Sequence, residues 1–289
     1  MNAIILAAGT SSRFIPLSYE KPKGLLTVRG EILIERQLRQ LREAGIDDII
    51  VVVGYKAEQF RYLVEKFDVR IVLNDDFARY NNTSSMIRVL DRLEDTFICC
   101  SDIYYSANVF LEPSTDSYYS AEYVGGKTSE YCMFTGEDGY IDQVTIGGCD
   151  AWYMTGHAFF RRSFSETFRK ILRFEYQFPE TKQMYWEDVI IKHLKELPLK
   201  IRKYPEGTVQ EFDSLEELRS FDSKYIDDSG SAVLKRICAE LGCQERDITH
   251  IERLSNESSR SGFSFSIAGK NDSPSFIFDR LTNSIIETI

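Results

Sequence analysis

Short apolar runs alternate with amphipathic stretches through the first hundred residues, and this alternation restricts the fold more than any other feature of the sequence. Continuous apolar runs predict buried strands at 3–6, 48–53, 69–73 and 96–100. Helical spacing of apolar residues predicts helices between them at 33–44, 57–67 and 84–93. Strands that are apolar on both faces and separated by helices are typical of a mainly parallel sheet covered on both sides. We therefore expect an α/β, Rossmann-like fold.

The middle of the chain has a different character, with many aromatic residues and several glycine-rich turns. Strands are expected at 118–124, 131–135, 143–146 and 152–160. Further helices are expected at 163–174, 185–195 and 215–225, with a strand near 199–203. The stretch Asp227–Ser231 has the composition of a linker. It divides the 289 residues into a predicted domain of residues 1–228 and a small C-terminal extension of residues 229–289.

Composition and charge exclude several classes of function. Hydrophobic residues make up 43% and charged residues 28%, as in ordinary globular proteins. The formal net charge is -10 and there is no long basic run, so nucleic acid and anionic membranes are poor partners. No stretch approaches the roughly 20 apolar residues of a membrane span, and no basic leader precedes the first strand, so we expect a cytoplasmic protein. The six cysteines form no C-x-x-C pair, which favours buried free thiols over zinc ligands.

The strongest local signal is Leu6-Ala7-Ala8-Gly9-Thr10-Ser11-Ser12-Arg13, followed by Lys21-Pro22-Lys23. A strand that ends in small residues lets a ligand approach the main chain, where several N–H groups can converge on phosphate oxygens. Arg13 adds a fork of donors suited to phosphate, and Lys23 adds a compact positive charge. The spacing is neither that of a Walker loop nor that of a dinucleotide fingerprint. The structural alternative is a plain strand and turn with surface cations.

Two acidic positions accompany this loop. Asp102 follows the strand at 96–100, at a carboxyl end where ligands bind in open α/β sheets. Asp213 lies in Glu211-Phe212-Asp213-Ser214, where Glu211 would share a strand face with it. The alternative role for Asp213 or Ser214 is the N-cap of the helix that begins at Leu215.

These stretches resemble the opening motif of sugar-phosphate and choline-phosphate nucleotidyltransferases, L-A-A-G-x-G-x-R-x-x-P-L followed by P-K. Ser11 stands where that motif has its second glycine, and a positive φ at this position would strain it. The resemblance is to the bacterial CTP:phosphocholine cytidylyltransferases and covers roughly residues 1–225. Further short matches lie in order at 45–50, 53–55, 59–60, 74–75, 80–82, 185–186 and 211–214.

The resemblance implies that CMP passes from CTP to phosphocholine, giving CDP-choline and pyrophosphate, by in-line attack of the acceptor phosphate with Mg²⁺ as cofactor. Arg13 and Lys23 would orient the phosphates, and Asp102 and Asp213 would hold the metal. The nucleotide would be bound by Leu6, Ala7, Ala8, Gly9, Thr10, Ser11, Ser12, Tyr80, Asn81, Asn82 and Ser85. For residues 80–85, an ordinary helix cap is the alternative.

The resemblance also implies an acceptor site, because aromatic faces and a carboxylate hold a quaternary ammonium. Its residues would be Tyr131, Tyr153, Tyr185, Trp186, Glu187 and Glu211. Here Tyr131 replaces a family tryptophan and Glu187 an aspartate. Aromatic residues make up 13% of the chain, so the core or a dimer surface is the alternative place for many of them.

Other functions stay open from the sequence. They are a cytidylyltransferase for 2-aminoethylphosphonate or phosphoethanolamine, a sugar-phosphate nucleotidyltransferase, and a nucleotide-binding module without turnover. The expected partners are CTP and a small phosphorylated amino alcohol, and a homodimer is left open. Residues 251–270 faintly resemble the opening strands of choline-kinase-like phosphotransferases, which follow this transferase in some chains. The alternatives for the extension are a part of such a kinase lobe, a relic of one, or a dimerisation element.

Overall fold

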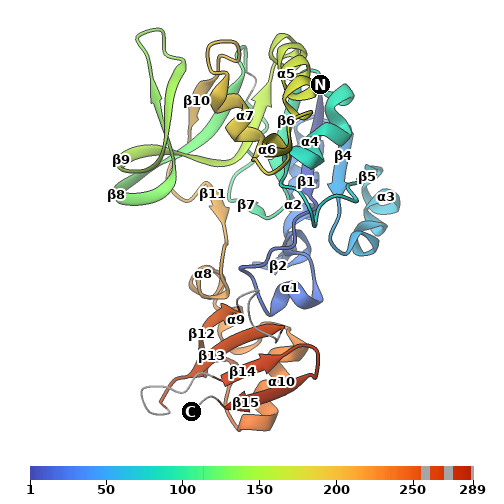
Figure 1. Cartoon of the computed structure of the whole chain (residues 1–289), viewed down its shortest axis with the longest axis vertical. Coiled ribbons are helices and arrows are strands. Elements are labelled where there is room, and N and C mark those ends of the chain that lie inside the picture. The colour runs from blue at the N-terminus through green and yellow to red at the C-terminus, as the bar shows by residue number, and fades with distance from the viewer. Residues whose placement is uncertain (113, 255–260, 270–275, 288–289) are drawn as a thin grey trace. The chain divides into compact units, whose positions relative to one another are not determined.

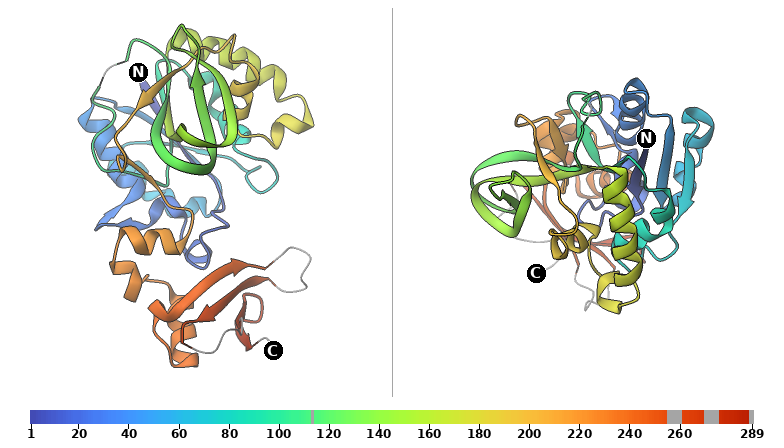
Figure 2. Two further views of the ribbon diagram at one scale, coloured as in Figure 1. Left: turned by 90° about the vertical axis from the view of Figure 1, so that its left-hand side faces the viewer. Right: turned by 90° about the horizontal axis from the view of Figure 1, so that it is seen from above.

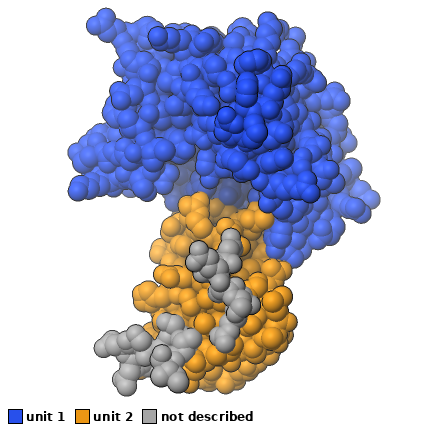
Figure 3. Space-filling model, in the orientation of Figure 1, with its two compact units in different colours: residues 1–9, 30–211 blue, residues 10–29, 212–289 orange. Residues whose placement is uncertain are grey.

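The computed structural model describes residues 1–112, 114–254, 261–269 and 276–287, and the chain divides into two compact units (Figure 3). Unit 1 consists of Met1–Gly9 and Gly30–Glu211. Unit 2 consists of Thr10–Arg29 and Phe212–Ile289. The chain therefore passes from one unit to the other after Gly9, after Arg29 and after Glu211. The predicted linker near residue 228 lies within unit 2, so the division into 1–228 and 229–289 stays a prediction.

Unit 1 is built on a mixed sheet of seven strands in the order β10-β8-β9-β6-β1-β4-β5 (Figure 1). Its parallel part agrees with the sequence prediction and consists of β1 (Asn2–Ala7), β4 (Asp48–Val53), β5 (Arg70–Leu73) and β6 (Thr96–Cys100). The remaining strands are β8 (Tyr118–Thr135), β9 (Ile141–Phe160) and β10 (Lys200–Lys203). Strand β9 is antiparallel to β6 and β8, and β10 is parallel to β8. The sheet is thus mainly parallel, as expected.

Helices and short elements of unit 1 connect these strands. They are β3 (Glu31–Ile32), α2 (Leu33–Glu43), η2 (Ala57–Phe60), α3 (Tyr62–Phe67), α4 (Thr83–Val89), η3 (Leu90–Arg92), β7 (Ile103–Tyr105), α5 (Arg162–Glu175), α6 (Pro179–Lys182), α7 (Trp186–Lys192) and β11 (Val209–Glu211). The helix predicted over 57–67 is a 3-10 turn followed by α3. Strands β7 and β11 form a separate antiparallel pair that apolar periodicity did not predict.

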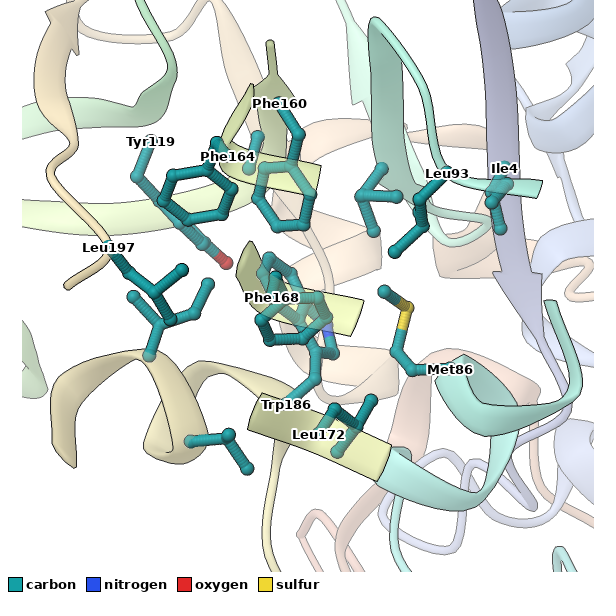
Figure 4. Packing of buried hydrophobic residues seen from close by; sticks show 14 of the residues in the cluster. Ile4, Met86, Leu93, Tyr119, Phe160, Phe164, Phe168, Leu172, Trp186 and Leu197 are labelled. Carbon is teal, nitrogen blue, oxygen red and sulfur yellow. The ribbon is translucent and has the colours of Figure 1, made fainter. Parts of the chain in front are cut away.

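An aromatic cluster packs α5 and α7 against β9 (Figure 4). The ring centroids of Phe160 and Phe164 lie 4.5 Å apart, and those of Phe160 and Trp186 lie 5.6 Å apart. Phe168 is fully buried in the same cluster. Burying one such side chain contributes about 1.5–3 kcal/mol. The cluster therefore fixes the beginning of α7, where several of the predicted site residues lie.

Strands β8 and β9 form one long ribbon, in which the sequence predicted four separate strands (Figure 2). The glycine pairs were expected to end the strands, but the pairing continues past them with shifts of register. Gly126 has φ +87° and donates its N–H to Asp150 Oδ1 at 2.8 Å. Glycine adopts a positive φ without strain, so the ribbon bends at a bulge instead of ending there.

Unit 2 contains a small antiparallel sheet in the order β12-β13-β14-β15. This sheet lies in the C-terminal part of the chain, where a small appendage was predicted. Its elements are α1 (Leu17–Glu20), η1 (Lys23–Leu25), β2 (Thr27–Val28), α8 (Leu215–Phe221), α9 (Lys224–Asp227), α10 (Ala232–Leu241), η4 (Glu245–Asp247), β12 (Ile248–Arg253), β13 (Gly262–Ile267), β14 (Phe276–Asp279) and β15 (Ser284–Glu287). Glu20 accepts hydrogen bonds from the Ser231 hydroxyl at 2.6 Å and the Ala232 N–H at 2.9 Å. This carboxylate ties the N-terminal segment of unit 2 to the start of α10.

Within the described ranges, no helix combines the length and the apolar character that a membrane crossing needs. The six cysteines are free thiols. Cys99 and Cys132 are buried as predicted, whereas Cys149 is exposed. Part of the stretch with the kinase-like pattern, residues 255–260 and 270, lies outside the described residues.

Candidate functional site

The parallel strands of unit 1 bring the small-residue segment and Asp102 to one edge of the sheet. Leu6 is in register with Cys100, and both lie at the carboxyl ends of their strands. The N–H of Ser101 donates to the Leu6 carbonyl oxygen at 3.0 Å. Gly9 is exposed just beyond β1, and nothing lies within 4 Å of the position that a Cβ would take there. The edge has the open, small-residue character that a phosphate needs for close approach.

A second glycine supports this edge from the neighbouring strand. A Cβ on Gly54 would lie 2.8 Å from Phe77 Cβ and 2.9 Å from the Ala8 carbonyl oxygen. That same oxygen accepts the N–H of Tyr55 at 3.1 Å. Gly54, from the Val53-Gly54-Tyr55 match, is therefore required by the close approach of two main-chain segments. Its role is to position the Ala7-Ala8-Gly9 turn.

The charges of three carboxylates act on the thiol at the end of β6. Burial raises the pKa of the Cys100 thiol well above its usual range, and the charges of Asp102, Glu211 and Glu187 raise it further, in that order. Asp102 is partly exposed and Glu211 is exposed. The three predicted acids are thus neighbours of one thiol, although they come from β6–β7, β11 and α7.

The donor set fits Mg²⁺ better than a metal that needs a full protein cage. Across the described ranges, no three His, Cys, Asp or Glu side chains are close enough together to enclose an ion. Mg²⁺ is commonly held by one or two carboxylates, with water and phosphate oxygens as the other ligands. The partly exposed carboxylate of Asp102 can serve in this way.

The segment predicted to bind the base is held by a buried asparagine that follows β5. Asn74 is 1% exposed, and its Nδ2 donates to the Ser84 hydroxyl at 2.9 Å and the Ser85 hydroxyl at 3.0 Å. The N–H of Asn81 donates to the Lys182 carbonyl oxygen at 2.9 Å. Tyr80 is partly exposed. Ser85 is buried in the first turn of α4, where its hydroxyl accepts the hydrogen bond from Asn74.

Asn82 connects this segment to α7. Its Oδ1 accepts the N–H of Trp186 at 2.8 Å. The side chain also hydrogen-bonds to the carboxyl group of Glu187, whose Oε1 accepts the Tyr119 hydroxyl at 3.0 Å. Burial, only partly offset by hydrogen bonds to the carboxyl group, raises the pKa of Glu187 to about 7. Asn82 thus lies between the predicted nucleotide segment and the predicted acceptor segment.

The aromatic residues predicted for the acceptor divide into two groups. Trp186 is 1% exposed, and its ring stacks on Tyr119 with centroids 5.7 Å apart. In Figure 4 it lies within the core, so it has no free face for a ligand and acts by fixing α7. Tyr131 and Tyr153 are partly exposed on the β8–β9 ribbon, and Tyr185 is exposed.

Tyr131 has an acidic partner that the sequence analysis did not select. Its hydroxyl donates to Asp188 Oδ1 at 3.0 Å, and Asp188 Oδ2 accepts the N–H of Tyr185 at 2.9 Å. Burial, followed by the charge of Asp188, raises the pKa of Tyr131 to about 12. Asp188 directly follows Glu187 in the sequence, so a second carboxylate accompanies the first at the start of α7.

In unit 2, Asp213 meets both predicted cations. Asp213 Oδ2 lies 2.9 Å from Arg13 Nη1, and Oδ1 lies 3.5 Å from Lys23 Nζ. Arg13 is exposed, whereas the Lys23 side chain is only 6% exposed. The N-cap of α8 is Ser214, whose hydroxyl accepts the N–H of Glu217 at 3.1 Å. The capping role thus belongs to Ser214, and Asp213 is directed to the cations.

The first turn of unit 2 contains Ser11, for which the sequence analysis expected strain if its φ is positive. Ser11 has φ +49°, in the left-handed region that glycine adopts more easily. Its carbonyl oxygen accepts the N–H of Phe14 at 2.9 Å, which closes a turn ahead of Arg13. Thr10 is exposed and Ser12 partly exposed, so both are accessible on unit 2.

Comparisons with known proteins identify the family of this chain. The family model described as "MobA-like NTP transferase domain" matches residues 3–118. The choline-phosphate cytidylyltransferase of Streptococcus pneumoniae is 33% identical over 77% of this chain and 97% of its own length. The 2-aminoethylphosphonate cytidylyltransferase of Lancefieldella rimae is 34% identical over 78% of this chain and 93% of its own length.

Solved structures have the same fold. That of the CTP:phosphocholine cytidylyltransferase from Streptococcus pneumoniae aligns with a TM-score of 0.74 at 33% identity, over 77% of this chain and 98% of the other. A glucose-1-phosphate thymidylyltransferase described as putative, from Bacillus anthracis, aligns with a TM-score of 0.63 at 16% identity, over 78% of this chain and 95% of the other. The second likeness concerns the fold alone.

Proposed function

Since the chain belongs to the MobA-like NTP transferases, and to the cytidylyltransferases among them, we propose that it transfers CMP from CTP to phosphocholine. The products are CDP-choline and pyrophosphate. The observation that carries the proposal is that Asp102 follows β6 at the edge where the Ala7-Ala8-Gly9 turn ends β1, with the charges of Glu187 and Glu211 acting on the same strand end. This edge combines an exposed glycine turn for phosphates with carboxylates for a metal and a cationic acceptor.

In the proposed reaction, an oxygen of the acceptor phosphate attacks the α-phosphorus of CTP in line, and the bond to pyrophosphate breaks. No protein nucleophile is needed, because positioning and charge neutralisation supply most of the catalysis in such transfers. When bound, Mg²⁺ supplies positive charge to the phosphate oxygens. We assign its carboxylate ligands to Asp102 and Asp213, and orientation of the phosphates to Arg13 and Lys23.

The acceptor end is assigned to α7 and the β8–β9 ribbon. An ionised Glu187 attracts a quaternary ammonium, and the faces of Tyr131, Tyr153 and Tyr185 are candidates for contact with its methyl groups. On the nucleotide side, Tyr80 and Asn81 are the candidates for the cytosine edge. A base that left their polar groups unpaired would be penalised.

Pyrophosphate release from CTP and Mg²⁺ tests the proposal with a panel of phosphocholine, phosphoethanolamine, 2-aminoethylphosphonate and glucose 1-phosphate. We expect the highest kcat/KM with phosphocholine. Asp102→Ala should lower kcat at least about 100-fold, as the loss of a charge-stabilising group does. Asp91→Ala removes an exposed acid that pairs with Arg173, and serves as the matched control. Turnover with the sugar phosphate alone would overturn the assignment of the acceptor.

A primary ammonium is the second candidate acceptor, as in 2-aminoethylphosphonate. The hydrogen bond between Tyr131 and Asp188 favours this acceptor. It places a second carboxylate, beside that of Glu187, next to the tyrosine that the family resemblance assigns to the acceptor site. A primary ammonium has N–H groups that carboxylates accept, whereas a quaternary ammonium has none.

Asp188→Asn separates the two acceptors, because it removes the charge while keeping an oxygen that can accept the N–H of Tyr185. If a primary ammonium is the natural acceptor, the variant should lose more kcat/KM with 2-aminoethylphosphonate than with phosphocholine. Equal losses with both acceptors would assign Asp188 to the capping of α7 alone.

A further inference from the structure

Glu122 on β8 is a buried carboxylate with no part in the reaction described so far. Its side chain is 2% exposed, and its Oε1 accepts the N–H of Val209 at 2.6 Å. Its Oε2 accepts the N–H of Gly207 at 3.1 Å. A buried carboxylate costs free energy unless it is hydrogen-bonded, and the main-chain N–H groups of Gly207 and Val209 meet that need. The turn at 207–209 is therefore folded around this carboxylate.

The turn leads directly into β11. Gly207 has φ +79°, and the N–H of Thr208 donates to the Pro205 carbonyl oxygen at 3.1 Å. The carbonyl oxygen of Thr208 in turn accepts the N–H of Ser106 at 2.9 Å. Glu122 thus holds the point at which the chain leaves β10 and begins to pair with β7.

The pairing of β11 with β7 carries this constraint to the acidic segment. Val209 is in register with Tyr105, and Glu211 with Ile103. Ile103 directly follows Asp102 in the chain. The register between β11 and β7 therefore determines that Glu211 pairs with the residue next to Asp102. Because the pair spans only three residues of each strand, its few hydrogen bonds give it little stability of its own.

We propose that Glu122 is a positioning residue for the metal side of the reaction, because its carboxylate fixes the turn that sets β11, and with it Glu211, next to Asp102. In this role Glu122 acts through the turn and β11, and not as a ligand of the metal. The inference rests on the proposed function in taking Asp102 and Asp213 as the metal carboxylates. Side chains that orient metal ligands indirectly are typically worth about 10-fold to about 100-fold in metal affinity or activity.

Glu122→Gln tests the proposal with little change in volume. The amide keeps one oxygen for the N–H of Val209, but its NH₂ group faces the N–H of Gly207, which loses its acceptor. Glu35→Gln is the matched control, since Glu35 is 5% exposed in the same unit but binds the Tyr62 hydroxyl and the Lys66 ammonium. Both variants lose a buried charge, and only the first releases the turn before β11.

Hydrogen exchange and Mn²⁺ binding are the readouts that do not depend on turnover. In Glu122→Gln, the amides of 207–211 should exchange faster than in the wild type. The dissociation constant of Mn²⁺ in the presence of CTP, measured by electron paramagnetic resonance, should rise about 10-fold or more. Steady-state assays should show a lower kcat and a higher Mg²⁺ requirement, with a smaller change in the KM for CTP at saturating Mg²⁺. Glu35→Gln should change none of these quantities.

Gly207→Ala gives a second route if Glu122→Gln does not fold. A Cβ at this position meets only Gln210 Nε2 at 3.7 Å, so the change strains the main chain without a clash. It should shift Mn²⁺ binding in the same direction by a smaller factor.

The outcomes separate the two proposals. Wild-type protein that binds no Mn²⁺ with CTP and releases no pyrophosphate overturns the proposed function. The positioning role is overturned if the wild type is active and Glu122→Gln binds Mn²⁺ as tightly as the wild type. Equal effects of Glu122→Gln and Glu35→Gln on Mn²⁺ binding also overturn it, because loss of any buried carboxylate would then explain the result.

Discussion

Lowering the pH from about 7.5 to about 5.5 should cost the folded protein about 1.4 kcal/mol through His157 alone. This residue lies on β9 in register with Cys99, and its side chain is 1% exposed. Within the described part of the chain, Nδ1 has no hydrogen-bond partner, and Nε2 lies 3.4 Å from the Tyr204 hydroxyl. Aromatic rings surround it, with the centroids of Tyr105 at 5.4 Å and Tyr118 at 6.0 Å.

Burial, followed by the charge of Arg202, lowers the pKa of His157 from 6.5 to about 3. The other titratable groups that face the ring are the phenols of Tyr105, Tyr118 and Tyr204, which stay neutral over this range of pH. Between the two pKa values the unfolded chain binds one proton more than the folded protein. The free energy of unfolding therefore falls as the pH falls below 6.5, by about 1.4 kcal/mol per unit.

Urea titrations of the wild type and His157→Gln at the two pH values measure this contribution. Glutamine keeps an acceptor for Tyr204 but does not titrate, so the wild type should lose about 1.4 kcal/mol more than the variant. The comparison cancels the carboxylates that both proteins share. The lower pH is kept at about 5.5 because a net charge of -10 at pH 7 approaches zero as carboxylates take up protons, and solubility then falls. Equal losses in both proteins, or an imidazole signal that titrates above about pH 6 in the folded state, would refute the reasoning.

Three further changes have defined outcomes. Lys23→Ala should lower kcat at least about 100-fold in the pyrophosphate assay while circular dichroism shows an intact fold, because it removes a phosphate-orienting charge. Gly54→Ala should destabilise the protein by about 1–3 kcal/mol in urea, since its Cβ would lie 2.8 Å from Phe77. The KM for phosphocholine should fall as the pH rises through about 7, where Glu187 ionises, and this fall should be absent in Glu187→Gln. A wild-type KM that follows the same pH profile as the variant would contradict that role for Glu187.

Three strands of the parallel half of unit 1, β1, β4 and β6, were predictable because they are largely buried on both faces. Residues 48–53 and 96–100 are continuous apolar runs, and both became strands with the predicted bounds. The β8–β9 ribbon was not predictable in the same way. Its glycine pairs carry the signal of a turn, yet main-chain pairing with the opposite strand resumes at Lys127, directly after Gly126. Such pairing depends on a partner elsewhere in the sequence, so local composition does not reveal it.

The site residues show the same distinction. Arg13, Lys23 and Asp213 lie in short motifs, and the structure brings their side chains together. Asn74 and Glu122 hold segments in place through hydrogen bonds that no motif marks. The N–H that Glu122 binds most closely lies 87 residues further along the chain. Only the tertiary fold shows that these two buried polar side chains have partners.

The division into units explains why a motif that is continuous in the sequence does not describe a single local structure. The opening motif is cut after Gly9, so Leu6–Gly9 belongs to unit 1 and Thr10–Lys23 to unit 2. The acidic motif is cut in the same way between Glu211 and Phe212. A protein with a net charge of -10 can bind a triphosphate only where cations are concentrated locally, and Arg13 and Lys23 both lie in the part of the motif that belongs to unit 2. The amides of the Ala7-Ala8-Gly9 turn and the carboxylate of Asp102 belong to unit 1.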